Sequence, residues 1–170
     1  MIPVEPVTPV DARMLEAIAA RQFGKHVAAF LHDNRARIGI ERSKNTGKIR
    51  FVHLDGELVL VLRPEEGFFS LSIPGARILY GLERDAMLNG IEVLDDVAEF
   101  IKDGKNVFAK HVVNPSATIQ PSQELYVCDS KREVLAVGKA ILSGRDMRYV
   151  KRGVAVSTRH GARKAGKGAV

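Results

Sequence analysis

The chain has 170 residues, 45% of them hydrophobic and 27% charged, which is enough apolar material for one large or two small packed cores. Its net charge of +6 and pI near 9.6 favour a polyanionic partner, nucleic acid before membrane, because the sequence contains no basic amphipathic helix. The single cysteine, Cys128, excludes an intrachain disulfide and a cysteine-based zinc site.

The longest apolar runs are only as long as a strand, and the sequence has no pattern typical of a signal peptide. We therefore expect a cytoplasmic protein without a membrane partner. The positive charge is concentrated after Gly144, which is typical of a binding face, although a solvated surface would give the same excess. The basic residues in this region are Arg145, Arg148, Lys151, Arg152, Arg159, Arg163, Lys164 and Lys167.

A helix is predicted to begin at Thr8, since Thr8 can cap it, Pro9 suits the first helical position and Asp11 lies near the positive end of the helix dipole. Gly24 is placed to end this helix. Its predicted core-facing stripe consists of Val10, Met14, Ala17 and Ile18.

From residue 38 to residue 73 the apolar residues alternate with a period of two, which predicts an antiparallel meander. Asp55-Gly56 is a strong signal for a two-residue hairpin. The predicted strands are Ile38–Arg42, Ile49–Leu54, Glu57–Leu62 and Phe68–Ile73. A short helix follows at Ala76–Leu82, and the first domain is expected to span residues 1–86 as a helix plus an antiparallel meander.

The second domain is predicted to cover residues 87–161 and to begin with a strand at Ile91–Leu94. Asp96 and Glu99 have capping-box spacing for a helix that ends at Gly104, with Val97, Phe100 and Ile101 facing the core. Further strands are predicted at Asn106–Val113, Glu124–Cys128, Val134–Leu142 and Arg152–Arg159. Many short strands separated by turn signals indicate a small, mostly-β barrel. Residues 162–170 are expected to form a basic disordered tail.

The stretch from Gly104 to Val113 contains a helix stop, a basic turn and a predicted half-buried strand. On the pattern alone, Gly104 is adequately explained as a helix C-cap and Lys110 as a solvent-facing residue. Phe108 has the aromatic ring that a base-stacking platform needs, but with valine beside it we expect it to lie in the core.

Residues 91–160 resemble the PUA domain, the RNA-binding pseudo-barrel attached to pseudouridine synthases and archaeosine transglycosylases. Three blocks carry the resemblance, in the expected order. They are Asp96–Ile101 with the following Gly104–Lys110, then Val134–Ala140, then Lys151–Val156. The resemblance implies that the protein has a pseudo-barrel fold and binds RNA.

Residues 13–80 are similar to the small domain that precedes PUA in archaeal archaeosine tRNA-guanine transglycosylase. The matching segments are Ala19–Gly24, Ser43–Arg50, Asp55–Leu58 and Leu62–Ala76. The catalytic barrel of that enzyme, with its aspartates, has no counterpart in this sequence. The resemblance therefore does not carry over the transglycosylase activity.

The resemblance implies that RNA lies against the helix, the glycine turn and the adjoining strands. Gly104 would let a phosphate approach the backbone, Lys105 and Lys110 would supply charge, and Asn106 would reach a base edge or a 2′-hydroxyl. Three cations at the ends of the last predicted strand are further candidates for phosphate contacts: Lys151, Arg152 and Arg159.

We expect a non-catalytic protein without a cofactor or metal that binds tRNA or other structured RNA as an accessory factor in RNA modification. It would work with a separate modification enzyme. The histidines are scattered without metal-binding spacing, and no nucleophile–base pair is evident. Two alternatives stay open. One is a small RNA-modifying enzyme, for which a cleft that brings together titratable residues, for example Asp95 or Asp96 with His111, would be the sign. The other is a protein-interaction module of a modification complex.

Overall fold

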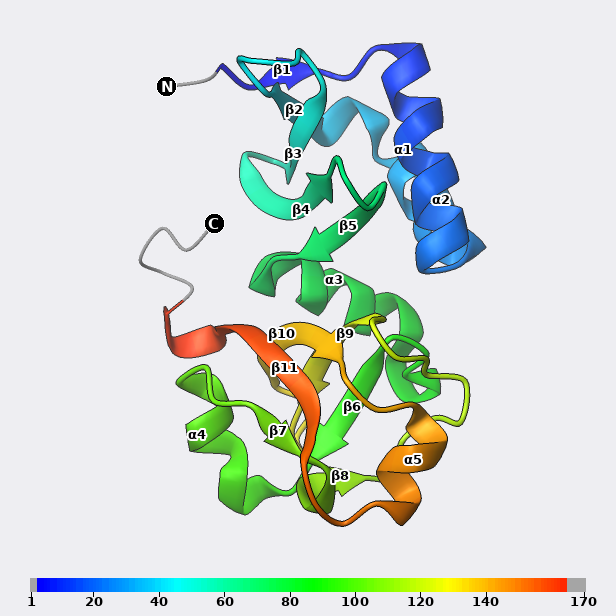
Figure 1. Cartoon of the computed structure of the whole chain (residues 1–170). Helices are drawn as coiled ribbons and strands as arrows, with labels where there is room; N and C mark the ends of the chain where they lie inside the picture. Colours follow the sequence, from blue (N-terminus) through cyan, green and yellow to red (C-terminus); the bar gives the residue numbers. More distant parts are fainter. Residues whose placement is uncertain (1–2, 165–170) are drawn as a thin grey trace. The chain divides into compact units, whose positions relative to one another are not determined.

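The computed structural model describes residues 3–164 (Figure 1). The chain forms two compact units, the first ending at Ser70 and the second beginning at Leu71. Within residues 3–164, no helix is long and apolar enough to cross a membrane.

Helix α1 (Pro9–Gln22) opens the first unit and begins where the sequence predicts. Thr8 Oγ1 accepts a hydrogen bond from Asp11 N at 3.1 Å, and the Asp11 carboxylate accepts one from Thr8 N at 3.3 Å. This reciprocal capping box satisfies two backbone donors at the start of the helix. Gly24, with φ +110°, separates α1 from a second helix, α2 (Lys25–Asp33), which the sequence analysis missed.

The core-facing side of α1 differs from the predicted stripe. Its buried side chains are Ala12, Leu15 and Ala19, whereas Val10 and Met14 are exposed. The 3-10 helix η1 (Arg35–Arg37) follows α2 and leads into the sheet.

The five-stranded sheet of the first unit has the order β1-β2-β3-β4-β5, and this confirms the predicted meander (Figure 1). Asp55 and Gly56 both have positive φ, +51° and +83°, as a tight hairpin turn requires. The pairs β1–β2, β2–β3 and β3–β4 are antiparallel. The strands are β1 (Glu5–Pro6), β2 (Ile38–Arg42), β3 (Ile49–Leu54), β4 (Glu57–Arg63) and β5 (Phe68–Leu71).

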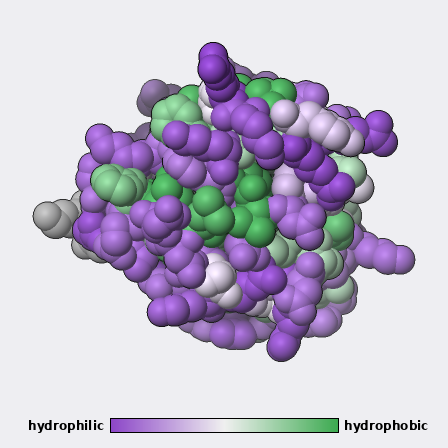
Figure 2. Space-filling view, turned by 90° about the horizontal axis from the view of Figure 1, so that it is seen from below, coloured by the Kyte–Doolittle hydropathy of each residue, from purple (hydrophilic) through white to green (hydrophobic). Residues whose placement is uncertain are grey.

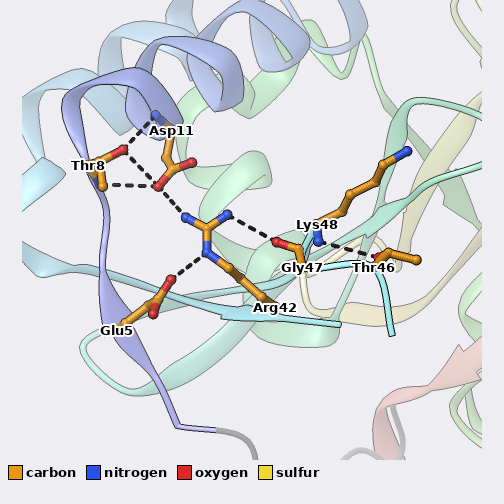
Figure 3. A network of polar contacts seen from close by, with 7 residues as sticks. All are labelled: Glu5, Thr8, Asp11, Arg42, Thr46, Gly47 and Lys48. Carbon is orange, nitrogen blue, oxygen red and sulfur yellow. Dashed lines mark hydrogen bonds and ion pairs between the residues drawn. The ribbon is translucent and has the colours of Figure 1, made fainter. Parts of the chain in front are cut away.

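Arg42 ties the N-terminal segment to the β2–β3 turn (Figure 3). Its guanidinium donates to Glu5 Oε1 at 2.5 Å, to Asp11 Oδ2 at 2.6 Å and to the carbonyl oxygen of Gly47 at 3.4 Å. Partial burial by itself would raise the pKa of Asp11. The hydrogen bonds from Thr8 and the charge of Arg42 outweigh this, so the pKa of Asp11 lies below its usual value.

Asp11→Asn is expected to reduce stability near neutral pH by about 1 kcal/mol, because the charge-assisted bonds to Arg42 are lost. A carboxylate whose pKa is lower in the folded state stabilises the fold above its unfolded pKa of about 3.9. That contribution is lost as the pH falls through the folded-state pKa. Thermal unfolding from pH 7 down to about 2.5 should therefore show the gap between wild type and variant narrowing. A gap that is the same at every pH would contradict this assignment, and Glu57→Gln, at an exposed carboxylate in β4, is the matched control.

The second unit begins with α3 (Ile73–Glu83) and η2 (Arg84–Ala86), followed by β6 (Gly90–Val93). Helix α3 packs against β9 (Glu124–Cys128) and β10 (Val134–Ala140). The compact units therefore divide before α3, whereas the sequence analysis placed the domain boundary after it, at residue 86. The Tyr126 hydroxyl on β9 donates to Glu83 Oε2 on α3 at 3.1 Å.

The remaining elements complete a six-stranded sheet with the order β7-β11-β10-β9-β6-β8. The strand pairs are antiparallel except for β6–β9, which is parallel. The result is the predicted mostly-β, nearly closed pseudo-barrel. Its other elements are η3 (Asp95–Val97), α4 (Ala98–Lys102), β7 (Val107–Phe108), η4 (Ala109–His111), β8 (Val112–Val113), α5 (Gly144–Tyr149), β11 (Val154–Gly161) and η5 (Ala162–Lys164).

One apolar core fills this barrel. It includes Ile101 of α4, Val107 of β7, Leu125 of β9, Leu135 of β10 and Val156 of β11, each at most 2% exposed. The expected disordered tail begins at residue 162, but residues 162–164 form η5. Residues 165–170 of that tail lie outside the described part of the chain.

Candidate nucleic-acid interface

The turn after α4 has the geometry expected of a helix stop. Gly104 has φ +93° and its N–H donates to Ile101 O at 2.9 Å, while Lys105 N donates to Phe100 O at 3.1 Å. A positive φ at this position favours glycine, because a side chain would strain the turn. The Lys105 side chain is exposed directly after it.

The end of β11 supports this turn from the other side. A Cβ atom added to Gly161 would lie 2.1 Å from the carbonyl oxygen of Lys102 and 2.6 Å from the nitrogen of Gly104. Only a residue without a side chain allows so close an approach of two backbones. Asn106 adds a second connection, since its Oδ1 accepts a hydrogen bond from Thr158 N at 3.0 Å. In this structure the Asn106 side chain therefore holds the turn onto β11.

The predicted strand from Asn106 to Val113 is interrupted. Strands β7 and β8 are only two residues each, and η4 lies between them. The physical reason is a change of partner, because β7 pairs with β11 at one end of the sheet order and β8 pairs with β6 at the other. Lys110 lies in η4 and is exposed.

Two phenylalanines that were expected in the core are exposed. Phe108 is 45% exposed, and its ring meets the His111 ring edge-on with 6.3 Å between centroids. Phe100 on α4 is also exposed, while the neighbouring Ala98 and Ile101 are buried. Both core assignments were wrong. At Phe108 the barrel interior is instead filled by Val107 and Ala109 on either side of it.

Lys151 and Arg152 are exposed in the segment that leads into β11. Ala109 N donates to Gly153 O at 3.0 Å, and Val154 pairs with Phe108. This pairing brings the segment that carries Lys151 and Arg152 beside β7 and η4. The structure thus gathers exposed cations and an exposed aromatic ring on one part of the second unit.

Arg159 belongs to a different arrangement. Its guanidinium forms two 2.7 Å contacts with the carboxylate of Glu124 and donates to Leu71 O at 2.8 Å. The Glu124 side chain is only 2% exposed and also accepts a hydrogen bond from Leu71 N at 2.8 Å. A guanidinium that neutralises a buried carboxylate has a structural role, so Arg159 is better explained as part of the fold than as a phosphate contact.

Seen from below, Figure 2 shows a group of apolar side chains surrounded by polar ones, on the side that carries α5 and β8 in Figure 1. Exposed large apolar and aromatic residues on these and adjoining segments are Leu94, Phe108, Tyr149 and Val150. Tyr149 is 82% exposed at the end of α5, a helix that the sequence analysis missed. Aromatic faces beside cations are surfaces on which unpaired bases stack.

Asp95, one of the residues named in the enzyme alternative, is hydrogen-bonded to Ser130. The Asp95 carboxylate accepts hydrogen bonds from the Ser130 hydroxyl at 2.6 Å and from Ser130 N at 3.0 Å. These bonds hold the pKa of Asp95 below its usual value. Within the described residues, no group of three or more His, Cys, Asp or Glu side chains is placed to hold a metal ion.

Comparison with known families accounts for most of the chain. Residues 13–83 match the patch-forming domain C2 of tRNA-guanine transglycosylase, and residues 89–162 match the PUA domain. The chain is a C2 domain followed by a PUA domain. The predicted resemblance is therefore confirmed for both parts. The Gly104 turn, η4 and the start of β11 all belong to the PUA domain.

Curated relatives of the C2–PUA pair are archaeal transglycosylases. The chain is 34% identical over 152 residues to the tRNA-guanine(15) transglycosylase of Methanothermobacter thermautotrophicus, covering 89% of this chain and 23% of that protein. It is 35% identical over 149 residues to the enzyme of the same name from Pyrococcus abyssi, covering 88% and 24%. The chain thus spans about a quarter of the length of these relatives.

Solved structures share the fold over nearly the full chain. A hypothetical protein from Pyrococcus horikoshii superposes with a TM-score of 0.71 at 21% identity and 95% coverage of both chains. A conserved PUA domain protein from Thermoplasma acidophilum gives a TM-score of 0.68 at 18% identity, covering 94% of this chain and 93% of that one. At these identities the likeness establishes the fold alone.

Proposed function

We propose that this C2–PUA chain binds tRNA or a similarly structured RNA without catalysing a reaction on it. The observation that carries the proposal is the exposed turn Gly104–Lys105 in a domain of an RNA-binding family. Glycine has no side chain to block the approach of a phosphate and the adjacent cation would attract it, while Lys110, Lys151 and Arg152 extend the positive surface. The tRNA assignment is supported by the names of the curated relatives.

We further propose an accessory role in RNA modification. The C2–PUA pair matches about a quarter of the length of each of two enzymes that are named for a transglycosylase activity. This matching part contains the Gly104–Lys105 turn, which we call the RNA grip. Under this proposal the chain supplies substrate affinity to a modification reaction whose catalytic residues lie on a separate enzyme. Affinity capture from extract, with and without nuclease, tests this part. Loss of every co-purifying modification enzyme after nuclease treatment would mean that RNA alone links them.

Lys105→Glu is expected to weaken tRNA binding about 10-fold or more at roughly 0.1 M salt, since it places a negative charge beside a bound phosphate. The melting temperature should change by less than about 2 °C, because the side chain is exposed. Filter binding and thermal unfolding of the same preparations measure the two effects.

Lys25→Glu is the matched control for that experiment. It makes the same charge change at an exposed position on α2 of the C2 domain and is expected to alter tRNA affinity by less than about 2-fold. Equal losses in the two variants would show that net charge alone determines binding. A large loss of stability in Lys105→Glu with intact binding would assign that residue a structural role.

A further inference from the structure

The proposed RNA grip has carboxylates at its edge. Asp103 immediately precedes Gly104, and Glu99 lies one turn earlier on α4. Their side chains are 44% and 68% exposed. Consecutive Cα atoms are about 3.8 Å apart and the Debye length at 0.1 M salt is about 10 Å, so a phosphate at Gly104 would lie within range of their negative charge. Uncompensated, these carboxylates would oppose RNA binding.

Arg163 in η5 contacts both of these carboxylates. Its Nη1 donates to Asp103 Oδ1 and its Nη2 to Glu99 Oε2. The planar guanidinium is suited to bridging two carboxylates, because its N–H donors point in fixed directions. Lys102 forms a further ion pair with Glu99, with Nζ 3.6 Å from Glu99 Oε1, and lies 3.1 Å from Glu133 Oε1.

The position of Arg163 follows from the fold. Gly161, two residues earlier, ends β11 and lies against the backbone of Lys102 and Gly104. The residues that follow β11 therefore begin beside the Gly104 turn. The cation that faces Glu99 and Asp103 is thus delivered by a segment about 60 residues away in the sequence. Spacing in the sequence gives no indication of this pairing.

We propose that Arg163 is a positioning residue for RNA, which masks Glu99 and Asp103 so that a phosphate can approach the Gly104–Lys105 turn. This inference rests on the proposed function. Arg163 acts through the two carboxylates and does not itself contact RNA. Arg163, Glu99 and Asp103 together carry a net charge of about −1, whereas the two carboxylates alone carry about −2.

The first test measures tRNA binding by the full chain at roughly 0.1 M salt. Arg163→Ala is expected to weaken binding about 3- to 10-fold and to leave the melting temperature nearly unchanged. Raising the salt to about 0.3 M should shrink the difference from wild type, because exposed charges are screened. A loss of affinity that does not depend on salt would indicate a structural role and overturn the proposal.

The second test adds Glu99→Gln and Asp103→Asn to Arg163→Ala. With the carboxylates neutralised, Arg163 has nothing to mask, so the triple variant should bind at least as well as wild type to within about 2-fold. A triple variant that stays as weak as Arg163→Ala would mean that Arg163 contacts RNA directly, which would overturn the proposal. Arg37→Ala is the matched control, since Arg37 forms an exposed ion pair with Asp55 in the C2 domain.

The outcomes separate this inference from the proposed function. If wild type binds no tRNA at low salt, the proposed function fails and the role of Arg163 fails with it. If wild type binds and Arg163→Ala binds equally well, only the masking role is wrong. If Arg163→Ala and Arg37→Ala weaken binding equally, the effect reflects net charge, and the masking role is again wrong.

Discussion

Arg159→Ala is expected to lower the free energy of unfolding of the PUA domain by about 3 kcal/mol or more, because it leaves the Glu124 carboxylate buried without its counter-ion. For a unit of about 100 residues, such as the one that begins at Leu71, that corresponds to a fall in melting temperature of about 12–24 °C. Leu71 loses a partner as well, since its carbonyl oxygen accepts from the same guanidinium. Thermal unfolding followed by circular dichroism measures the effect.

Arg163→Ala provides the contrast for that prediction. Arg163 also pairs with carboxylates, but its side chain is 48% exposed. The side chains of its partners, Asp103 and Glu99, are 44% and 68% exposed. Exposed ion pairs contribute little to stability, because water replaces the lost contacts. If both arginine variants lowered the melting temperature equally, burial of Glu124 would not be what makes the first pair important.

Gly161→Ala is expected to reduce both stability and RNA binding. The added methyl group would meet the carbonyl oxygen of Lys102 and the nitrogen of Gly104, and these backbone atoms cannot rotate away as a flexible side chain can. Overpacking of this kind costs about 1–3 kcal/mol, and we expect the upper part of that range. Because the displaced backbone belongs to the grip, tRNA affinity should fall as well, and this is measured on the fraction that remains folded at low temperature.

Gly81→Ala is the control for that substitution. Gly81 lies in α3, and an added Cβ would have no atom within 4 Å. Alanine is the better helix former, so this variant should be more stable than wild type by about 0.5–1 kcal/mol, with unchanged binding. If Gly161→Ala were as well tolerated as Gly81→Ala, the backbone contact between β11 and the grip would be looser than described.

Local sequence patterns were sufficient to predict much of the fold. The strands of the C2 sheet were predicted from period-two alternation and from Asp55-Gly56, and the start of α1 from Thr8 and Asp11, because these signals act within a few residues. Helix α2 was missed although its buried residues, Val27 and Leu31, have the helical spacing of four, since nine residues provide little more than two turns of that pattern. Helix α5, with six residues, is shorter still.

The candidate site was harder to predict, because it is formed by contacts between residues that are far apart in the sequence. Val107 and Ala109 alternate as a strand would, yet the chain turns at η4 because the barrel closes there. Nothing local distinguishes Arg159 from Arg152, but Glu124, 35 residues away, makes the former structural. The masking role inferred for Arg163 likewise required knowing where β11 ends.

If this C2–PUA chain binds structured RNA through phosphate contacts, its affinity for bulk tRNA must fall as the salt concentration rises. We predict clear binding at 50 mM salt and, for about four neutralised phosphates, a loss of affinity of about 10²-fold by 200 mM. The logarithm of the binding constant should fall linearly with the logarithm of the salt concentration. Undetectable binding at 50 mM salt, or an affinity that does not change with salt, would show that the chain does not bind RNA through phosphate contacts.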